Sequence, residues 1–246
     1  MAGREIVLSE RLKSLADMVS IGKRVVDVGC DHGFLSIYLV QHGISPGVLA
    51  MDVRKGPLSG AQEHIAEYKM DNYIETRLSD GLSKYKTGEA QSLVCAGMGG
   101  RLMMKILTES REKAKTLEEL ILQPQSELPA FRRFLKEEGY LTLEENILCE
   151  EGKFYFLFKV RFAPEEVKQT EEDFGQERLY EKYGKLLLQE KHPVLKQYLE
   201  IMQRKAMQIE GQIADSMKKG DAGRAERRLQ EVRQELADVN EALAML

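Results

Sequence analysis

The chain has 246 residues, 43% of them hydrophobic and 31% charged, a composition that is typical of a globular protein and excludes a wholly disordered one. Its 36 basic and 40 acidic residues give a net charge of −4, so any nucleic acid must be bound by a local basic patch. No segment approaches the roughly 18 apolar residues of a membrane span, and charges stand where a signal peptide needs its apolar run, so we expect a cytoplasmic protein without membrane attachment.

A leading helix is predicted ahead of the first strand, because Leu8, Leu12, Leu15 and Met18 recur at helical spacing. From residue 23 to residue 160, short β-branched runs alternate with amphipathic stretches, which is the pattern of βαβ units around a parallel sheet. The expected strands cover residues 24–29, 47–53, 73–78, 92–96, 120–123, 141–149 and 153–162. The expected helices between them cover residues 34–42, 57–68, 101–110 and 128–138.

The last two expected strands are joined by residues 150–152 alone, too few for a crossover helix, so they are predicted to form an antiparallel hairpin. Five parallel strands followed by a hairpin are the arrangement of the class I (Rossmann-like) methyltransferase fold. We therefore expect an α/β protein with a seven-stranded, mostly parallel sheet, and we assign this domain to residues 1–162.

The remaining residues, 163–246, predict a second, helical domain. Apolar residues are spaced alternately by four and three positions from 195 to 213 and again from 225 to 243, which indicates two coiled-coil seams. The sequence KKGDAG at 218–223 predicts the turn of an antiparallel hairpin. One further helix is expected over residues 174–189.

The three cysteines do not predict a disulfide or a metal site. Cys30, Cys95 and Cys149 are far apart in the sequence, and each lies in or beside an apolar run, so we expect three buried thiols. No spacing of histidine, cysteine and carboxylate residues resembles a metal site, and no metal is expected.

The first strand leads into a glycine turn, VVDVGCDHG at residues 25–33, which places a ligand over the carboxyl edge of the sheet. A loop that binds a dinucleotide pyrophosphate reads GxGxxG and offers free helix amides. Here Asp27 and Asp31 would repel a pyrophosphate, whereas they would attract the ammonium and sulfonium groups of S-adenosylmethionine. The predicted cofactor contacts in this turn are Asp27, Gly29, Cys30 and Gly33.

The second and third strands also end in acids. Asp52, followed by Val53, lies 25 positions beyond Asp27 (52 − 27), where a carboxylate can accept hydrogen bonds from both ribose hydroxyls. Asp80, followed by Gly81, can accept from the adenine amino group. Each acid alone is equally typical of a strand-end turn or a helix cap. Their joint placement after three successive strands favours an adenosyl cofactor.

The residues that follow the fourth and fifth strands are expected to lie where the methyl group of the cofactor meets the target base. Ala96 and Gly97 are expected to contact the cofactor, and Met98, Gly99 and Gly100 the target base, because glycines let a flat ring approach. Gln125 offers an amide for the edge of a base. The alternative for residues 96–100 is a structural turn with a helix cap. The alternative for the segment around Gln125 is a polar turn ahead of the next helix.

Asp31 and His32 are the candidates for a catalytic proton acceptor. His32 is the histidine that lies inside a motif. The alternative for His32 is a hydrogen bond to the backbone of its own loop.

At these residues the chain resembles the bacterial TrmK family, which methylates N1 of adenine 22 in tRNA with S-adenosylmethionine. The resemblance rests on DVGCDHGFLSIYL, AMDV, SDGL, CAGMGG, LQPQSE and FRRFLKEEGY, and it covers nearly the whole chain. It implies cofactor contacts by Asp27, Gly29, Asp52, Asp80 and Gly81, and a target-base pocket around residues 97–100.

The chain departs from the general methyltransferase pattern in two places. Asp31 stands where a glycine is usual, and AGMGG replaces the Asn/Asp-Pro-Pro-aromatic motif of enzymes that methylate exocyclic amines. Such an amine has its lone pair delocalised into the ring, whereas ring N1 has an in-plane lone pair at neutral pH. The second departure therefore suits a ring nitrogen that needs positioning more than a strong base.

A tRNA partner requires a basic surface, and the sequence places one in the predicted hairpin. Its residues are Lys218, Lys219, Arg224, Arg227, Arg228 and Arg233. The alternative is a solvated coiled-coil face. We expect a monomer.

Three other functions stay open. The chain could methylate another RNA base, a small molecule or a protein, with the hairpin serving dimerisation. It could be a non-catalytic binding module that keeps the fold. A nicotinamide enzyme is disfavoured by the acidic loop.

Overall fold

The computed structural model describes residues 5–167, 171–217 and 222–246, with no side chains described for 171–174 and 222–224. The chain divides into two compact units, Met1–Gln169 and Thr170–Leu246. Each unit is described by itself. The finer prediction of a domain boundary after residue 162 stays a prediction.

The first unit is built on a seven-stranded sheet in the order β3-β2-β1-β4-β5-β7-β6. Its strands are β1 (Val25–Val28), β2 (Val48–Asp52), β3 (Ile74–Leu78), β4 (Ser92–Met98), β5 (Glu119–Pro124), β6 (Tyr140–Glu150) and β7 (Lys153–Phe162). The first five run parallel, and β7 is antiparallel to both β5 and β6. The predicted seven strands, the terminal hairpin and the class I fold are confirmed.

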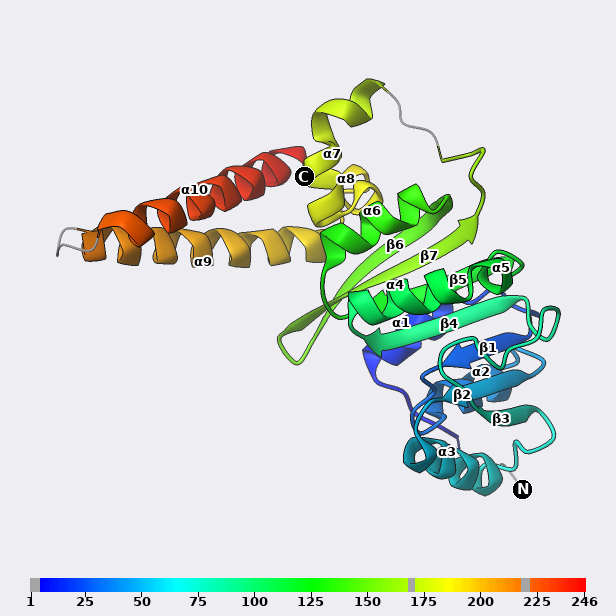
Figure 1. The fold of residues 1–246 in the computed structure, drawn as a ribbon. Helices are drawn as coiled ribbons and strands as arrows, with labels where there is room; N and C mark the ends of the chain where they lie inside the picture. The colour runs from blue at the N-terminus through cyan, green and yellow to red at the C-terminus, as the bar shows by residue number, and fades with distance from the viewer. Residues whose placement is uncertain (1–4, 168–170, 218–221) are drawn as a thin grey trace. The chain divides into compact units, whose positions relative to one another are not determined.

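Helices cover both faces of this sheet (Figure 1). They are α1 (Glu10–Met18), α2 (Phe34–Gln41), α3 (Lys55–Glu67), α4 (Gly100–Glu109), α5 (Arg111–Ala114) and α6 (Leu128–Glu137). Buried side chains of α1, α2 and α3, such as Leu15, Ile37 and Ile65, share one core cluster with β-branched strand residues. The inner parallel strands β1, β2 and β5 are buried on both faces, which explains their apolar sequences, whereas β3, at the edge of the sheet, is partly exposed and carries polar residues.

The strand order reverses between β1 and β4. The chain moves outward from β1 to β2 and β3, then returns to place β4 on the other side of β1. In open α/β sheets a ligand binds at such a point, beyond the carboxyl ends of the strands. The fold therefore gathers at one edge the segments that follow β1, β2, β3 and β4.

The second unit consists of α7 (Glu171–Tyr183), α8 (Lys185–Gln189), α9 (Pro193–Met217) and α10 (Ala222–Met245). The prediction of one helix over residues 174–189 is wrong. Gly184, at φ 96°, separates α7 from α8, because only glycine adopts this backbone conformation without strain.

Helices α9 and α10 run antiparallel, as predicted. Glu210 pairs with Arg233 at 2.8 Å, and Gln203 bonds Asn240 at 2.7 Å, so later residues of α10 meet earlier residues of α9. Leu199 and Val239 of the expected seams are buried, whereas Ile209 is 36% exposed. The coiled-coil geometry stays a prediction, and most of the predicted turn, residues 218–221, lies outside the described residues.

The expectation of three buried thiols is correct for Cys30 and Cys95 and wrong for Cys149. Cys149 lies one residue before the end of β6, the edge strand of the sheet, beside the hairpin turn to β7, whereas Ile147, two positions earlier on the same face, is buried. No described helix is long and apolar enough to cross a membrane. Within the described residues no cluster of His, Cys, Asp or Glu side chains could hold a metal ion.

Candidate functional site

A pocket of about 490 Å³ lies at the carboxyl edge of the parallel strands. It is lined by the turn after β1, the ends of β2, β3 and β4, one helical turn of α1 and part of α4. Carboxylates dominate its charge. They are Asp27, Asp31, Asp52 and Asp80.

The turn after β1 requires its glycines. Gly29 has φ 78°, and a Cβ there would come within 2.9 Å of the Met98 side chain. Gly33 has φ 74°, and its missing Cβ lets α2 approach α3 at Ala61. The amides of Gly29 and Cys30 both donate to the carbonyl of Met51, at 2.8 and 3.0 Å. These bonds fix the turn against the end of β2.

Two of the carboxylates are almost fully buried. Asp27 is 4% exposed and accepts a 2.7 Å hydrogen bond from the Ser36 hydroxyl. Asp52 is 5% exposed and accepts from the Arg54 amide at 2.8 Å and the Asp31 amide at 3.4 Å. Burial raises the pKa of Asp27 to about 6 against the lowering effect of the Ser36 bond, and the charge of Asp52 adds to the rise. The pocket therefore favours a cation.

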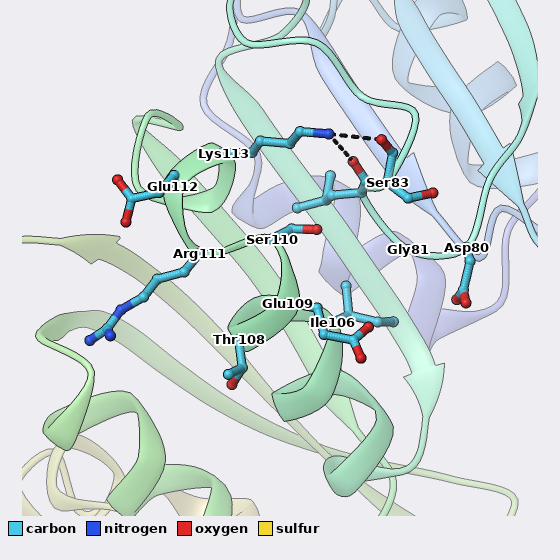
Figure 2. A pocket seen from close by; sticks show the side chains of 11 residues that line it. Asp80, Gly81, Ser83, Ile106, Thr108, Glu109, Ser110, Arg111, Glu112 and Lys113 are labelled. Atoms are coloured by element: carbon cyan, nitrogen blue, oxygen red, sulfur yellow. Dashed lines mark hydrogen bonds between the residues drawn. The ribbon is translucent and has the colours of Figure 1, made fainter.

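The turn after β3 is braced from two sides. Ser79 donates its amide to the Asp52 carbonyl at 2.9 Å and its hydroxyl to the Gly81 carbonyl at 2.8 Å. Lys113 of α5 donates to the carbonyls of Leu82 and Ser83, at 3.0 and 2.8 Å, and Figure 2 shows its side chain extending to Ser83. A second pocket, of about 460 Å³, is lined in part by Lys113, Leu82 and Ser83, and it shares Asp80, Gly81 and Ile106 with the first. These hydrogen bonds fix the backbone on both sides of Asp80, whose carboxylate is exposed.

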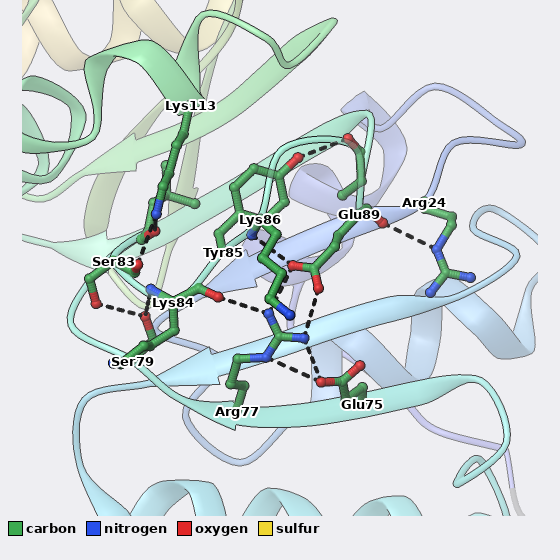
Figure 3. A network of polar contacts seen from close by, with 12 residues as sticks. Arg24, Glu75, Arg77, Ser79, Ser83, Lys84, Tyr85, Lys86, Glu89 and Lys113 are labelled. Carbon is green, nitrogen blue, oxygen red and sulfur yellow. Dashed lines mark hydrogen bonds and ion pairs between the residues drawn. The ribbon is translucent and has the colours of Figure 1, made fainter.

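A polar network on β3 holds the rest of this loop (Figure 3). Arg77 pairs with Glu75 at 2.6 Å and with Glu89 at 2.8 Å, and it donates to the Lys84 carbonyl at 2.9 Å. Hydrogen bonding to Arg77 lowers the pKa of Glu89. The network ties the segment between β3 and β4 to β3 at Lys84, in its middle, and at Glu89, near its end.

The ends of β4 and β5 meet through one buried amide. Gln123 is fully buried, and its Oε1 accepts from the Gly97 amide at 3.2 Å and from Nη1 of Arg11 at 3.1 Å. Gly97, at φ 77°, exposes its backbone to the pocket. A Cβ there would lie 3.9 Å from both Nη1 of Arg11 and Nε2 of Gln125.

Three aromatic rings lie beside the pocket. His32 and Phe34 line it, with ring centroids 6.1 Å apart, and His64 of α3 stacks on Phe34 at 4.5 Å. His64 Nδ1 is 3.0 Å from the His32 carbonyl. Nε2 of His32 lies 3.8 Å from Oδ1 of Asp31, and both side chains are about half exposed or more.

Comparison with known proteins decides between the functions that this geometry allows. A family model for a methyltransferase domain matches residues 8–158. The chain belongs to this methyltransferase family. The nicotinamide alternative is thereby removed.

The relatives of this methyltransferase include tRNA-modifying proteins. The tRNA (adenine(22)-N(1))-methyltransferase of Bacillus subtilis (strain 168) is 36% identical over 151 residues, 61% of this chain and 63% of the relative. The chain thus matches less than two thirds of that relative's length.

Solved structures match over nearly the whole chain. A putative tRNA (m1A22) methyltransferase of Streptococcus pneumoniae is 29% identical with a TM-score of 0.82, covering 96% of this chain and 100% of that one. A further crystal structure of that protein is a complex with S-adenosyl-L-methionine. The B. subtilis m1A22 tRNA methyltransferase TrmK is 27% identical with a TM-score of 0.80, covering 97% and 100%. The resemblance to the TrmK family is confirmed.

Most of the predicted site residues line the pocket of this methyltransferase. They are Asp27, Gly29, Cys30, Asp31, His32, Asp52, Val53, Asp80, Gly81, Ala96, Gly97, Met98 and Gln125. Gly33, Gly99 and Gly100 do not line it. Gly100 instead is the first residue of α4, where the backbone packs closely against Ser126. A Cβ on Gly100 would lie 2.4 Å from the Ser126 carbonyl oxygen, so a larger residue does not fit.

The predicted basic cluster is described only in part. Lys218 and Lys219 lie outside the described residues, as does the side chain of Arg224. Arg227 and Arg228 are exposed on α10. Arg228 pairs with Glu231 at 2.9 Å, which offsets part of its charge.

Sequence reasoning missed several pocket residues. Arg11 and Leu12 come from α1, Arg54 follows β2, and Leu102 and Ile106 come from α4. Leu102 and Ile106 have the i, i+4 spacing of one helix face, a signal that was available. Arg11 has no signal in the sequence, because its place depends on Gln123, 112 residues away.

Proposed function

We propose that this methyltransferase transfers the methyl group of S-adenosylmethionine to N1 of an adenine in tRNA, at position 22 by analogy with its TrmK relatives. The observation that carries the proposal is a single pocket, lined by Asp27, Asp52 and Asp80, at the ends of three successive strands of a methyltransferase fold. The cofactor complex of the S. pneumoniae relative supports the same donor.

The residues present fit this donor. Asp27 and Asp52 are buried at the pocket wall. A sulfonium and an ammonium group nearby would offset the free-energy penalty of burying these two negative charges. A carboxylate at Asp52 suits the ribose hydroxyls, and one at Asp80 suits the adenine amino group. When bound, the donor supplies a methyl group on a positively charged sulfur.

The proposed target base enters beside Gly97, Met98 and Gln125. Gly97 has no side chain, and its backbone is exposed, so a flat ring can approach. Because N1 already has an in-plane lone pair, the work of these residues is to hold it about 3–3.5 Å from the methyl carbon, in line with the sulfur.

We propose Asp31 or His32 as the acceptor that eases loss of the N6 proton from the cationic ring. Both side chains line the pocket and reach solvent, so a proton taken up can leave. Asp31→Ala and His32→Ala should each lower the single-turnover rate at saturating cofactor. Unchanged rates for both would remove them from the chemistry.

A tRNA substrate explains the second unit. N1 lies on the Watson–Crick edge, so a paired adenine must be unstacked at a cost of a few kcal/mol. Contacts elsewhere on the tRNA can supply that energy, and we propose that the helical unit provides them through residues including Arg227 and Arg228. The tRNA substrate supports the proposal that the protein acts in the cytoplasm, and we propose that it acts as a monomer.

One experiment tests the function directly. The protein is incubated with methyl-labelled S-adenosylmethionine and unmodified bulk tRNA, and the labelled nucleoside is mapped. We expect label at N1 of one adenine. Label on another base, or on a small molecule or protein, would redefine the substrate, and failure to bind the donor would indicate a binding module.

A further inference from the structure

We infer that Lys153, held over the ring of Tyr155, binds a backbone phosphate of the tRNA next to the target adenine. The inference rests on the proposed tRNA substrate, and it adds a contact on the first unit to those proposed for the second. Both residues lie at the start of β7, beside the turn that joins it to β6, and neither lines the cofactor pocket.

The register of the sheet places the start of β7 at the edge where the target base is proposed to enter. Strand β7 is antiparallel to β5 and pairs Phe158 with Leu122. Three positions toward the start of β7 and the end of β5, the same register sets Tyr155 level with Gln125, which lines the pocket. Lys153 lies two residues beyond Tyr155, about 7 Å further out at the rise of a strand. Figure 1 shows the turn between β6 and β7 at the same edge of the sheet as the carboxyl end of β4.

The ring of Tyr155 connects Lys153 with the pocket. Lys153 Nζ lies over this ring, 5.0 Å from its centre, and the guanidinium carbon of Arg11 lies 5.5 Å from the same centre. Arg11 lines the pocket, and its Nη1 would lie 3.9 Å from a Cβ on Gly97. The ring is half-buried against the core of the first unit, so it provides an ordered surface for the ammonium group of the exposed lysine.

The charge of Lys153 is available to an anion. Its cross-strand partner in the hairpin is Glu150, but Oε1 of Glu150 accepts a hydrogen bond from the Arg11 amide at 3.2 Å. Within the described residues, no carboxylate lies within ion-pairing distance of Lys153. A lysine ammonium is a compact cation with three donors, which suits a phosphate oxygen. Because the target nucleotide must enter the pocket, the phosphates that flank it come close to this edge of the sheet.

The test uses tRNA in which one backbone phosphate at a time, beside the target adenine on either side, is replaced by an uncharged methylphosphonate. With the full-length wild-type protein, one of these replacements should weaken tRNA binding about fivefold, the effect of one lost ion contact at physiological salt. Lys153→Gln should weaken binding of intact tRNA by about the same factor, and that replacement should then have an effect of about twofold or less. The slope of log affinity against log salt should be smaller by about one in this variant.

Matched variants make the result specific. Lys153→Arg keeps the charge and should bind tRNA like the wild-type protein, whereas Tyr155→Leu removes the ring and should weaken tRNA binding less than Lys153→Gln does. Lys86→Gln removes an exposed lysine near β3, at the opposite edge of the sheet, and should change neither the affinity nor the salt slope (Figure 3). Each variant should keep its affinity for S-adenosylmethionine, which shows that it is folded.

The outcomes separate this inference from the proposed function. If every methylphosphonate weakened tRNA binding by Lys153→Gln as much as by the wild-type protein, or if the salt slope were unchanged, Lys153 would not bind a phosphate there, while methyl transfer to tRNA would still stand. A wild-type protein that neither binds nor methylates tRNA would overturn the proposed function itself.

Discussion

At the scale of single residues, Asp27 connects the stability of the pocket to its ligand. Burial raises the pKa of this carboxyl group to about 6, so the folded protein without ligand holds a proton on Asp27 below that pH. A bound cation favours the ionised carboxylate and lowers its pKa. Binding of the donor must therefore release a proton when the pH lies below about 6.

The affinity for S-adenosylmethionine should consequently rise between pH 5 and pH 7 and level off above it. The slope can reach tenfold per pH unit, which corresponds to about 1.4 kcal/mol. Calorimetry at several pH values measures the slope and the released proton. In Asp27→Asn the affinity at pH 7.5 should fall and the slope should flatten, and a variant with the wild-type slope would show that another group titrates.

At the scale of secondary-structure elements, Glu119 joins β4 and β5 at the amino ends of the parallel strands, which is the end opposite to the pocket. It begins β5 and accepts hydrogen bonds from the Ser20 amide at 2.9 Å, the Ser20 hydroxyl at 2.6 Å and the Ser92 hydroxyl at 2.6 Å. Lys23 and Lys159 lie 3.4 and 3.3 Å away. Burial raises the pKa of Glu119, but the bonds from Ser20 and Ser92 outweigh it and hold the pKa at about 2.

Because the pKa of Glu119 is lower in the folded state, its ionised form stabilises the fold above about pH 4.5, and this stabilisation is lost as the pH falls toward 2. Glu119→Gln should lower the free energy of unfolding at pH 7 by about 3 kcal/mol, and by less at pH 3. Urea unfolding at both pH values measures this. The control is Glu118→Gln, since Glu118 is 58% exposed and pairs with Lys23, and it should cost less than about 1 kcal/mol. An equal loss in both variants would contradict the role of burial.

At the scale of the whole molecule, the proposed division of labour assigns chemistry to residues 1–169 and tRNA contacts to residues 170–246. Deletion of residues 170–246 should leave S-adenosylmethionine affinity within about threefold and abolish methylation of tRNA. Circular dichroism and calorimetry check that the truncated chain is folded. Full activity of the truncated protein would show that the helical unit serves another purpose.

A milder change tests the same division in the full-length chain. Substituting Arg227→Gln and Arg228→Gln together should weaken tRNA binding and reduce the slope of log affinity against log salt by about one for each lost phosphate contact. Affinity for S-adenosylmethionine is the internal control and should not change. An unchanged salt slope would place the tRNA contacts elsewhere.

The sequence by itself determined the fold class and most of the pocket. Strands and helices differ in the period of their apolar residues, and acids that follow parallel strands must meet at one edge, so Asp27, Asp52 and Asp80 could be placed together without coordinates. The tertiary structure decided which glycines face the pocket, that Cys149 is exposed, and that α7 ends at Tyr183, just before Gly184. It also brought Arg11 to Gln123. Such contacts depend on packing between residues far apart in the chain, whereas a sequence pattern reports on neighbours a few positions away.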